Sequence, residues 1–96
     1  MRLVVPNSND NATIEKHVPE VKKVGNEVTV NVGSVLHPST PDHYIEWIEL
    51  ETNSTVQREY LKPGDVPSAK FILTKEDEEI VNVYAYCNIH GLWSRY

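Results

Sequence analysis

The chain has 96 residues, and its nine Lys and Arg side chains against 14 Asp and Glu give a formal charge of −5. A chain of this length encloses one modest hydrophobic core, so residues 1–96 are expected to form a single domain. The acidic balance argues against nucleic acid or an anionic membrane as a partner. No apolar run approaches the roughly 18 residues of a membrane-spanning helix, and residues 1–7 lack the apolar core of a signal peptide. A cytoplasmic protein is therefore expected.

The first 14 residues are expected to form a polar N-terminal arm, because an unbroken run of polar residues occupies positions 7–11. Beyond the arm, apolar and polar residues alternate with the period of two that is typical of β-strands. Predicted strands cover residues 27–32, 43–51, 55–61, 69–73 and 80–86. The six prolines fall between them, where a missing N–H does little harm. Regularly spaced strands and no convincing helix predict an all-β sandwich.

The last predicted strand is expected to bury one of its faces. Val81, Val83 and Ala85 share the face of Cys87, while polar and aromatic residues alternate with them. Residues 74–79, which precede this strand, are mostly charged and are predicted to form a loop rather than a helix.

Histidine and cysteine residues lie at the ends of the predicted strands or in the turns between them. They are His17, His37, His43, Cys87 and His90. Cys87 and His90 form a Cys-x-x-His pair, a spacing that lets a sulfur and an imidazole nitrogen reach one metal ion. Gly91 gives the chain the conformational freedom to leave this turn. The pair is a candidate metal-binding site.

Each of these residues also has an ordinary structural explanation. A lone histidine is usually a surface residue or a hydrogen-bonded core residue. Cys87 beside Val83 and Ala85 would be a small buried hydrophobic residue, and Trp47 and Trp93 would be core or interface aromatics. The metal interpretation gains weight because all the thiol and imidazole side chains occur together at strand ends.

The donor set limits the choice of metal without deciding it. Thiolate and imidazole suit zinc, copper or iron. Blue copper commonly adds an axial methionine, and the single methionine here is Met1. Structural zinc takes four ligands and would leave one of the five unused. Four imidazoles and one thiolate fit a five-coordinate iron with an open sixth position. The residues alone leave three interpretations: an iron enzyme, an iron electron-transfer protein, and a zinc-binding or metal-free interaction module.

Three segments together resemble the superoxide reductases, a family that includes neelaredoxin and the iron-binding domain of desulfoferrodoxin. The segments are Glu15–Pro19, His37–Ile48 and Cys87–Trp93, and they follow the family's order. The chain lacks the four cysteines of the extra N-terminal domain of desulfoferrodoxin, so it resembles the one-iron form. The resemblance implies an immunoglobulin-like, seven-stranded antiparallel β-sandwich, in agreement with the strand pattern.

The resemblance also implies a mononuclear non-haem iron site and a reaction. It assigns four equatorial imidazole ligands and one axial thiolate to a single Fe²⁺/Fe³⁺ ion per chain. The equatorial ligands would be His17, His37, His43 and His90, and the axial ligand would be Cys87. Glu15 would take the sixth position in the oxidised state, and Lys16 would lie beside that position. The reaction would be the one-electron reduction of superoxide to hydrogen peroxide without release of dioxygen, an oxidative-stress defence. The implied partners are a rubredoxin-like electron donor and further copies of the chain in a homodimer or homotetramer.

Electrostatics give Lys16 a specific role. A chain of charge −5 repels an incoming anion, so its net charge cannot attract superoxide. Salt confines useful attraction to roughly 10 Å, which requires a cation at the mouth of the site. Lys16, next to His17, is the candidate.

Overall fold

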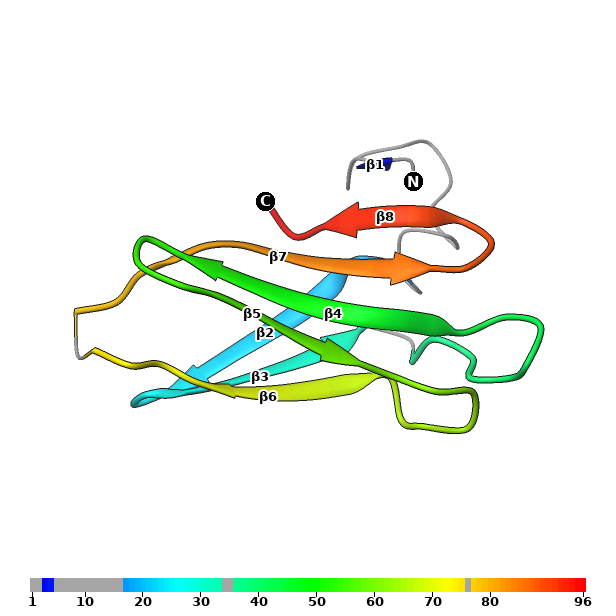
Figure 1. The fold of residues 1–96 in the computed structure, drawn as a ribbon, viewed down its shortest axis with the longest axis horizontal. Coiled ribbons are helices and arrows are strands. Elements are labelled where there is room, and N and C mark those ends of the chain that lie inside the picture. The colour runs from blue at the N-terminus through cyan, green and yellow to red at the C-terminus, as the bar shows by residue number, and fades with distance from the viewer. Residues whose placement is uncertain (1–2, 5–16, 34–35, 76) are drawn as a thin grey trace.

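Two β-sheets pack face to face in the computed structural model, which describes residues 3–4, 17–33, 36–75 and 77–96 (Figure 1). The strands span Leu3–Val4 (β1), Pro19–Val24 (β2), Glu27–Val32 (β3), Ile45–Thr52 (β4), Val56–Tyr60 (β5), Ser68–Ile72 (β6), Ile80–Cys87 (β7) and Gly91–Ser94 (β8). The larger sheet has the order β1-β8-β7-β4-β5, and the smaller sheet has the order β2-β3-β6. The predicted seven-stranded antiparallel sandwich is confirmed by β2 to β8, while the short β1 adds a parallel pairing to β8.

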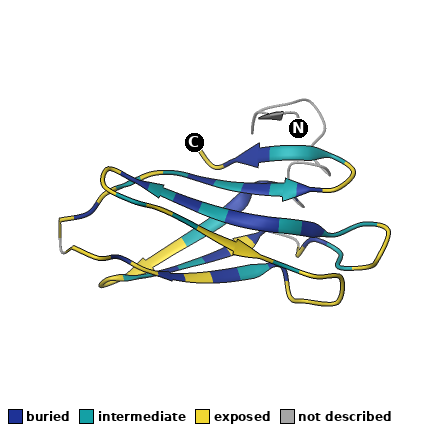
Figure 2. Cartoon of the chain, in the orientation of Figure 1, coloured by how far each residue is buried: buried dark blue, intermediate teal, exposed yellow. Residues whose placement is uncertain are grey.

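The core lies between the two sheets and follows the alternation of the sequence. Val28, Val30 and Val32 of β3 are fully buried, and they face Ile48 and Leu50 of β4 within one cluster of hydrophobic side chains. Figure 2 shows the resulting bands of buried and exposed residues along the strands. Burying one such aliphatic side chain stabilises the fold by about 1.5–3 kcal/mol, so this contact between the sheets is the main source of stability.

The five predicted strands correspond to β3 through β7, and β2 and β8 were not among them. In β2, burial declines along the strand from a buried Pro19 to an exposed Val24, so its side chains show no alternation. Backbone pairing with β3 defines this edge strand instead. The short β8 begins at Gly91 and is held between β7 and β1. The predicted N-terminal arm, residues 1–14, lies outside the described residues except for β1.

The prediction that Val81 lies on the buried face was wrong, because 51% of this residue is exposed. Glu51 of β4 pairs with Asn82, but the next residue, Thr52, pairs with Ile80. This register shift gives β7 an extra residue at Val81, as in a β-bulge. The bulge turns Val81 outward, while Ile80 packs against the core.

A buried carboxylate closes the end of the sandwich at which β4 ends and β7 begins. Glu78 is 2% exposed and accepts hydrogen bonds from the hydroxyls of Thr52 and Thr55. The backbone N–H of Thr74 also donates to it, at 2.7 Å. These hydrogen bonds, with those from Thr52 and Thr55 the strongest, lower the pKa of Glu78 to about 2. The predicted charged loop is therefore present. One of its carboxylates, that of Glu78, is buried and holds the loop against Thr52 and Thr55 through hydrogen bonds.

Across the described part of the chain, no helix has the length and apolar character needed to cross a membrane.

Candidate metal centre

Strand ends bring the four histidines and the cysteine to one end of the sandwich, on the right of Figure 1. His17 lies two residues before the start of β2, and His37 and His43 lie in the connection between β3 and β4. Cys87 is the last residue of β7, and His90 lies in the turn that leads into β8. The fold thus gathers residues that are as many as 73 positions apart.

The Cys-x-x-His turn folds around its own sulfur. Cys87 and Gly91 pair across the turn, and Gly91 has a φ of 85°, in the left-handed region that favours glycine. The backbone N–H of His90 donates to the Cys87 sulfur at 3.4 Å. The Nδ1 atom of His90 lies 3.9 Å from the same sulfur. The predicted chelating pair therefore has both donor atoms on one side of the turn.

Asn88 connects this turn to the loop that carries His43. Its Oδ1 atom accepts a hydrogen bond from the backbone N–H of Tyr44 at 2.9 Å. Its Nδ2 atom donates to the carbonyl of Asp42 at 3.0 Å. The sequence identified no role for Asn88, because the residues that it contacts lie more than 40 positions away.

The four imidazole rings stand at the corners of a square. Ring centres are 4.6 Å apart for His17–His37, 4.6 Å for His37–His43, 5.1 Å for His43–His90 and 4.7 Å for His90–His17. The diagonal from His17 to His43 is longer, at 6.0 Å. Adjacent rings are inclined by 64° to 81°, whereas the diagonal pair is inclined by only 30°. The four rings therefore surround a common centre.

Three ring nitrogens converge inside the square. The Nε2 atom of His17 lies 3.1 Å from Nε2 of His37 and 3.1 Å from Nδ1 of His90. The other nitrogen of His37 contacts the carbonyl of Pro38 at 2.6 Å. Because a carbonyl only accepts, Nδ1 of His37 carries the proton and Nε2 carries the lone pair that faces inward. Burial lowers the pKa of His37 to about 4, so its ring is neutral at pH 7, the form that binds a metal.

The sulfur completes the cluster. Donor atoms of His17, His43, Cys87 and His90 all lie within 4.8 Å of one another. His37 stands beside this group through its short contact with His17. Cys87 is fully buried, and burial raises the pKa of its thiol, although backbone N–H groups of His90 and Ile89 act in the opposite direction. A bound cation would convert such a thiol to the thiolate.

Four of the five predicted ligands, His17, His43, Cys87 and His90, thus form a group that could hold a metal ion, and His37 lies beside it. Neutral imidazoles and a thiol that becomes a thiolate are suitable donors for iron, copper or zinc. Four imidazole rings and a cysteine sulfur are one donor more than the four ligands of structural zinc. Glu15 and Lys16, the two other predicted site residues, lie outside the described residues, and their roles stay predictions.

Fold and site together define an all-β sandwich with a His and Cys metal-binding cluster at one end, and the comparisons with known proteins identify its family. A family model described as Desulfoferrodoxin matches residues 9–96. The chain belongs to the desulfoferrodoxin family.

Individual relatives and solved structures are similar to the chain and agree with this family assignment. A desulfoferrodoxin homolog from Archaeoglobus fulgidus is 53% identical over 79 residues, which cover 82% of this chain and 61% of the homolog. The crystal structure of the superoxide reductase from Treponema pallidum has a TM-score of 0.82 and 44% identity, covering 88% of this chain and 69% of that one. The superoxide reductase (1Fe-SOR) from Giardia intestinalis has a TM-score of 0.71 and 34% identity, covering 83% and 94%.

Proposed function

We propose that this chain is a superoxide reductase, which converts superoxide to hydrogen peroxide with one electron and two protons and releases no dioxygen. The observation that carries the proposal is the square of four imidazoles with a buried cysteine sulfur beside it. Five donors of this kind leave one position of an octahedral ion open to a substrate. The names of the Treponema and Giardia structures add support.

The residues that would hold the metal are His17, His37, His43 and His90, through their imidazoles, and Cys87, through its thiolate. One iron per chain, alternating between Fe²⁺ and Fe³⁺, would supply the electron that superoxide accepts. The protein holds the donors in place before the metal arrives. The Pro38 carbonyl fixes the His37 tautomer, and the amide that donates to the Cys87 sulfur favours its thiolate form.

Lys16 and Glu15 have distinct proposed roles next to His17. Lys16 supplies the positive charge that attracts the anionic substrate and holds a proton-donating water. Glu15 would be a further ligand of the metal in the oxidised state only. A Glu15→Ala variant should therefore have an altered spectrum in the oxidised state and reduce superoxide almost as fast as the parent chain. An oxidised spectrum identical to the parent's would remove Glu15 from the ligand set.

The proposal extends to the electron donor and to the location of the chain. A rubredoxin-like protein would reduce the iron after each turnover. The location would be the cytoplasm, because a cysteine ligand must stay reduced until the metal binds. The sequence-based alternatives of an electron carrier and of a zinc-binding or metal-free module gain no support from the square of imidazoles.

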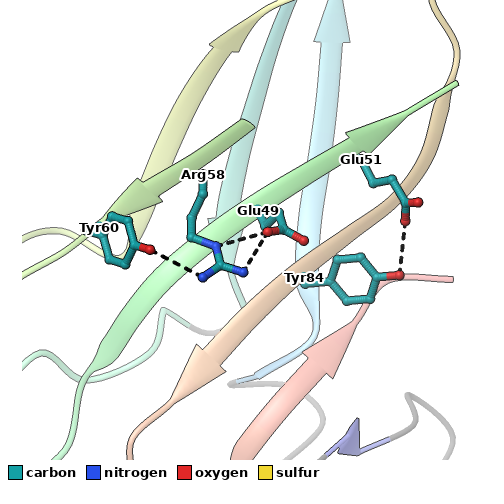
Figure 3. Close-up of polar contacts among 5 residues, drawn as sticks. All are labelled: Glu49, Glu51, Arg58, Tyr60 and Tyr84. Atoms are coloured by element: carbon teal, nitrogen blue, oxygen red, sulfur yellow. Dashed lines mark hydrogen bonds and ion pairs between the residues drawn. The ribbon is translucent and has the colours of Figure 1, made fainter. Parts of the chain in front are cut away.

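We also propose that a second copy of the chain docks on the outer face of the larger sheet. Arg58 lies 3.8 Å from the centre of the Trp47 ring and donates hydrogen bonds to Glu49 at 2.8 Å and to the Tyr60 hydroxyl at 3.3 Å (Figure 3). Tyr60 is largely exposed. Aromatic residues and arginine are enriched in interfaces, and a face with both charges can pair with its own copy about a twofold axis. This pairing would form a homodimer, or one contact of a homotetramer.

Light scattering on the Arg58→Glu variant tests that contact, because the change places a third acidic charge beside Glu49 and Glu51. We expect the variant to be monomeric at concentrations at which the parent chain associates. Lys70→Glu, the same charge reversal on the smaller sheet, is the control and should leave the mass unchanged. An associated Arg58→Glu variant would contradict this interface.

Optical spectroscopy and metal analysis test the proposed activity. The purified chain should contain one iron and show a visible thiolate-to-iron band after oxidation, which a reductant bleaches. It should also consume superoxide without producing dioxygen. Cys87→Ser should lose the visible band, because the oxygen cannot supply that transition. A chain that retains only zinc, or that releases dioxygen from superoxide, would contradict the proposal.

A further inference from the structure

An aromatic side chain covers the flat face of one candidate ligand. Trp93 of β8 is 1% exposed, and its ring stacks on that of His17 with centres 4.9 Å apart and an inclination of 20°. The rings of His37 and His90 meet His17 edge-on, at 74° and 76°. His17 precedes β2, outside the paired part of that strand, so the contacts of its ring with Trp93, His37 and His90 contribute to its orientation.

Core packing alone does not explain why a tryptophan occupies this position. Trp93 is outside the main cluster of buried hydrophobic residues. Its Nε1 atom is buried and has no hydrogen-bond partner among the described residues. Leaving a buried N–H without a partner costs stability, and phenylalanine would fill much of the space without that cost. The indole therefore has a use that offsets this cost.

The electrostatics of stacking indicate what that use is. A cation bound to Nε2 of His17 withdraws electron density from the imidazole and makes the ring partly positive. The face of an indole is negative and attracts positive charge more strongly than the faces of tyrosine and phenylalanine. The contact between Trp93 and His17 is then stronger with a metal bound than without one. By linkage, the same difference increases the affinity for the metal.

We propose that Trp93 is a positioning residue that orients His17 and tightens metal binding through this stack. The inference rests on the proposed function in one respect, that His17 binds the metal. It requires that Trp93 affect metal affinity and the ligand field, beyond any effect on folding.

The second tryptophan of the chain is a matched control. Trp47 of β4 is also almost buried, and it stacks on Tyr86 with centres 5.7 Å apart and an inclination of 15°. Arg58 covers it at 3.8 Å, so its aromatic contacts resemble those of Trp93 without involving a candidate ligand. Equivalent substitutions at the two positions separate loss of packing from loss of the stack on His17.

The experiment uses Co²⁺ as the probe on the full chain after removal of its metal. Affinity is measured by competition with a chelator, the ligand field by visible absorption, and stability by denaturant unfolding without metal. Trp93→Leu should weaken Co²⁺ binding by about 10–100-fold, the usual effect of losing a group that orients a ligand. Trp93→Phe keeps a flat ring and should weaken it by only about threefold, with a smaller change in absorption. Trp47→Leu and Trp47→Phe should lower stability and leave affinity and absorption unchanged.

Fluorescence supplies a second measurement. In Trp47→Phe, Trp93 is the only tryptophan, and Co²⁺ should quench most of its emission. In Trp93→Phe, the emission of Trp47 should fall much less.

Each outcome separates the two proposals. Trp93→Leu and Trp93→Phe variants that bind Co²⁺ like the parent chain, with the same absorption, would overturn the inference and leave the proposed function intact. A parent chain that does not bind Co²⁺ would overturn both. If Trp93→Leu does not fold, the comparison of Trp93→Phe with Trp47→Phe decides in the same way.

Discussion

At the residue scale, hydrogen bonds around the candidate metal centre hold its proposed ligands in place. The outer nitrogen of His37 donates to the Pro38 carbonyl, which leaves the inner nitrogen able to bind a metal. The N–H of His90 points at the Cys87 sulfur. Asn88 holds the turn between them against the loop of His43. Such contacts fix ligands in advance, so less entropy is lost when the ion binds.

Asn88 gives a direct test of this view. Asn88→Ala removes the hydrogen bonds to Tyr44 and Asp42, and it should cost about 1–2 kcal/mol of unfolding free energy. It should also weaken iron binding by about tenfold, because the loop of His43 is no longer held to the Cys87 turn. Chelator competition measures the affinity. Asn53→Ala is the control, since Asn53 accepts a comparable hydrogen bond from Glu79 at the other end of the molecule. Equal affinities in the two variants would contradict the role of Asn88.

The types of the site residues were predictable from the sequence, but their geometry was not. Thiol and imidazole side chains at the ends of predicted strands indicate a metal site, and the Cys-x-x-His spacing indicates one chelating pair. The neighbours of His17 in the square depend on how β2, β7 and β8 are placed, which no local pattern encodes. The stack of Trp93 on His17 was equally unpredictable from local sequence patterns, because it joins residues from opposite ends of the chain.

At the element scale, strands with strict alternation were predictable and strands held by pairing were not. The buried valines of β3 define both its limits and its inner face. The edge strand β2 and the short β8 lack alternation of their own and are defined by backbone hydrogen bonds to neighbouring strands, β3 for β2 and both β7 and β1 for β8. The bulge in β7 is a further example, because it arises from the register against β4.

The bulge predicts opposite results for two valines of the same strand. Val83 is fully buried, so Val83→Ala should lower the unfolding free energy by about 1–3 kcal/mol through lost burial and a residual cavity. Val81 is half exposed, and Val81→Ala should change stability by no more than about 0.5 kcal/mol. Denaturant unfolding of both variants measures the difference. Comparable losses would mean that Val81 faces the core, as the simple alternation predicted.

The carboxylate of Glu78 makes the unfolding free energy of the chain depend on pH in acidic solution. Its pKa is about 2 in the folded chain against an ordinary value of 4.5, so its stabilising contribution is complete above pH 4.5. The contribution is lost as the pH falls from 4.5 towards 2, where the folded carboxylate takes up its proton. Unfolding of the metal-free chain should therefore show a steeper loss of stability over this range than Glu78→Gln does. Glu79→Gln, at the exposed neighbour, should retain the parent's slope. Parallel curves for the parent chain and Glu78→Gln would contradict the anchoring role.

At the scale of the whole molecule, the two ends of the sandwich have different tasks. The end with the Cys87 turn carries the histidines, and the opposite end is closed by Glu78 and its threonine partners (Figure 1). The net charge of −5 is a property of the whole chain and repels an anionic substrate from every side. Attraction of an anion to the metal end therefore requires a local cation whose effect there exceeds the repulsion from the net negative charge.

The proposed role of Lys16 predicts a change in the sign of the salt dependence. In the parent chain, local attraction dominates, so added salt should slow the second-order reaction with superoxide. In Lys16→Ala, only the repulsive field of the acidic chain remains, so the reaction should be slower at low salt and should speed up as salt is added. Pulse radiolysis or stopped flow over a range of ionic strength measures both rates. Iron content should be unchanged, because Lys16 is not a proposed ligand.

Lys75→Ala is the control for this experiment, since it removes the same charge from the exposed loop at the opposite end of the sandwich, on the left of Figure 1. If net charge alone governed the encounter, the two variants would lose rate equally. If Lys16 acts locally, Lys75→Ala retains the parent's decline of rate with salt and Lys16→Ala alone reverses it. A Lys16→Ala variant with the parent's rate constant at low salt would remove Lys16 from the mouth of the site and leave the acidic chain without an identified means of attracting its substrate.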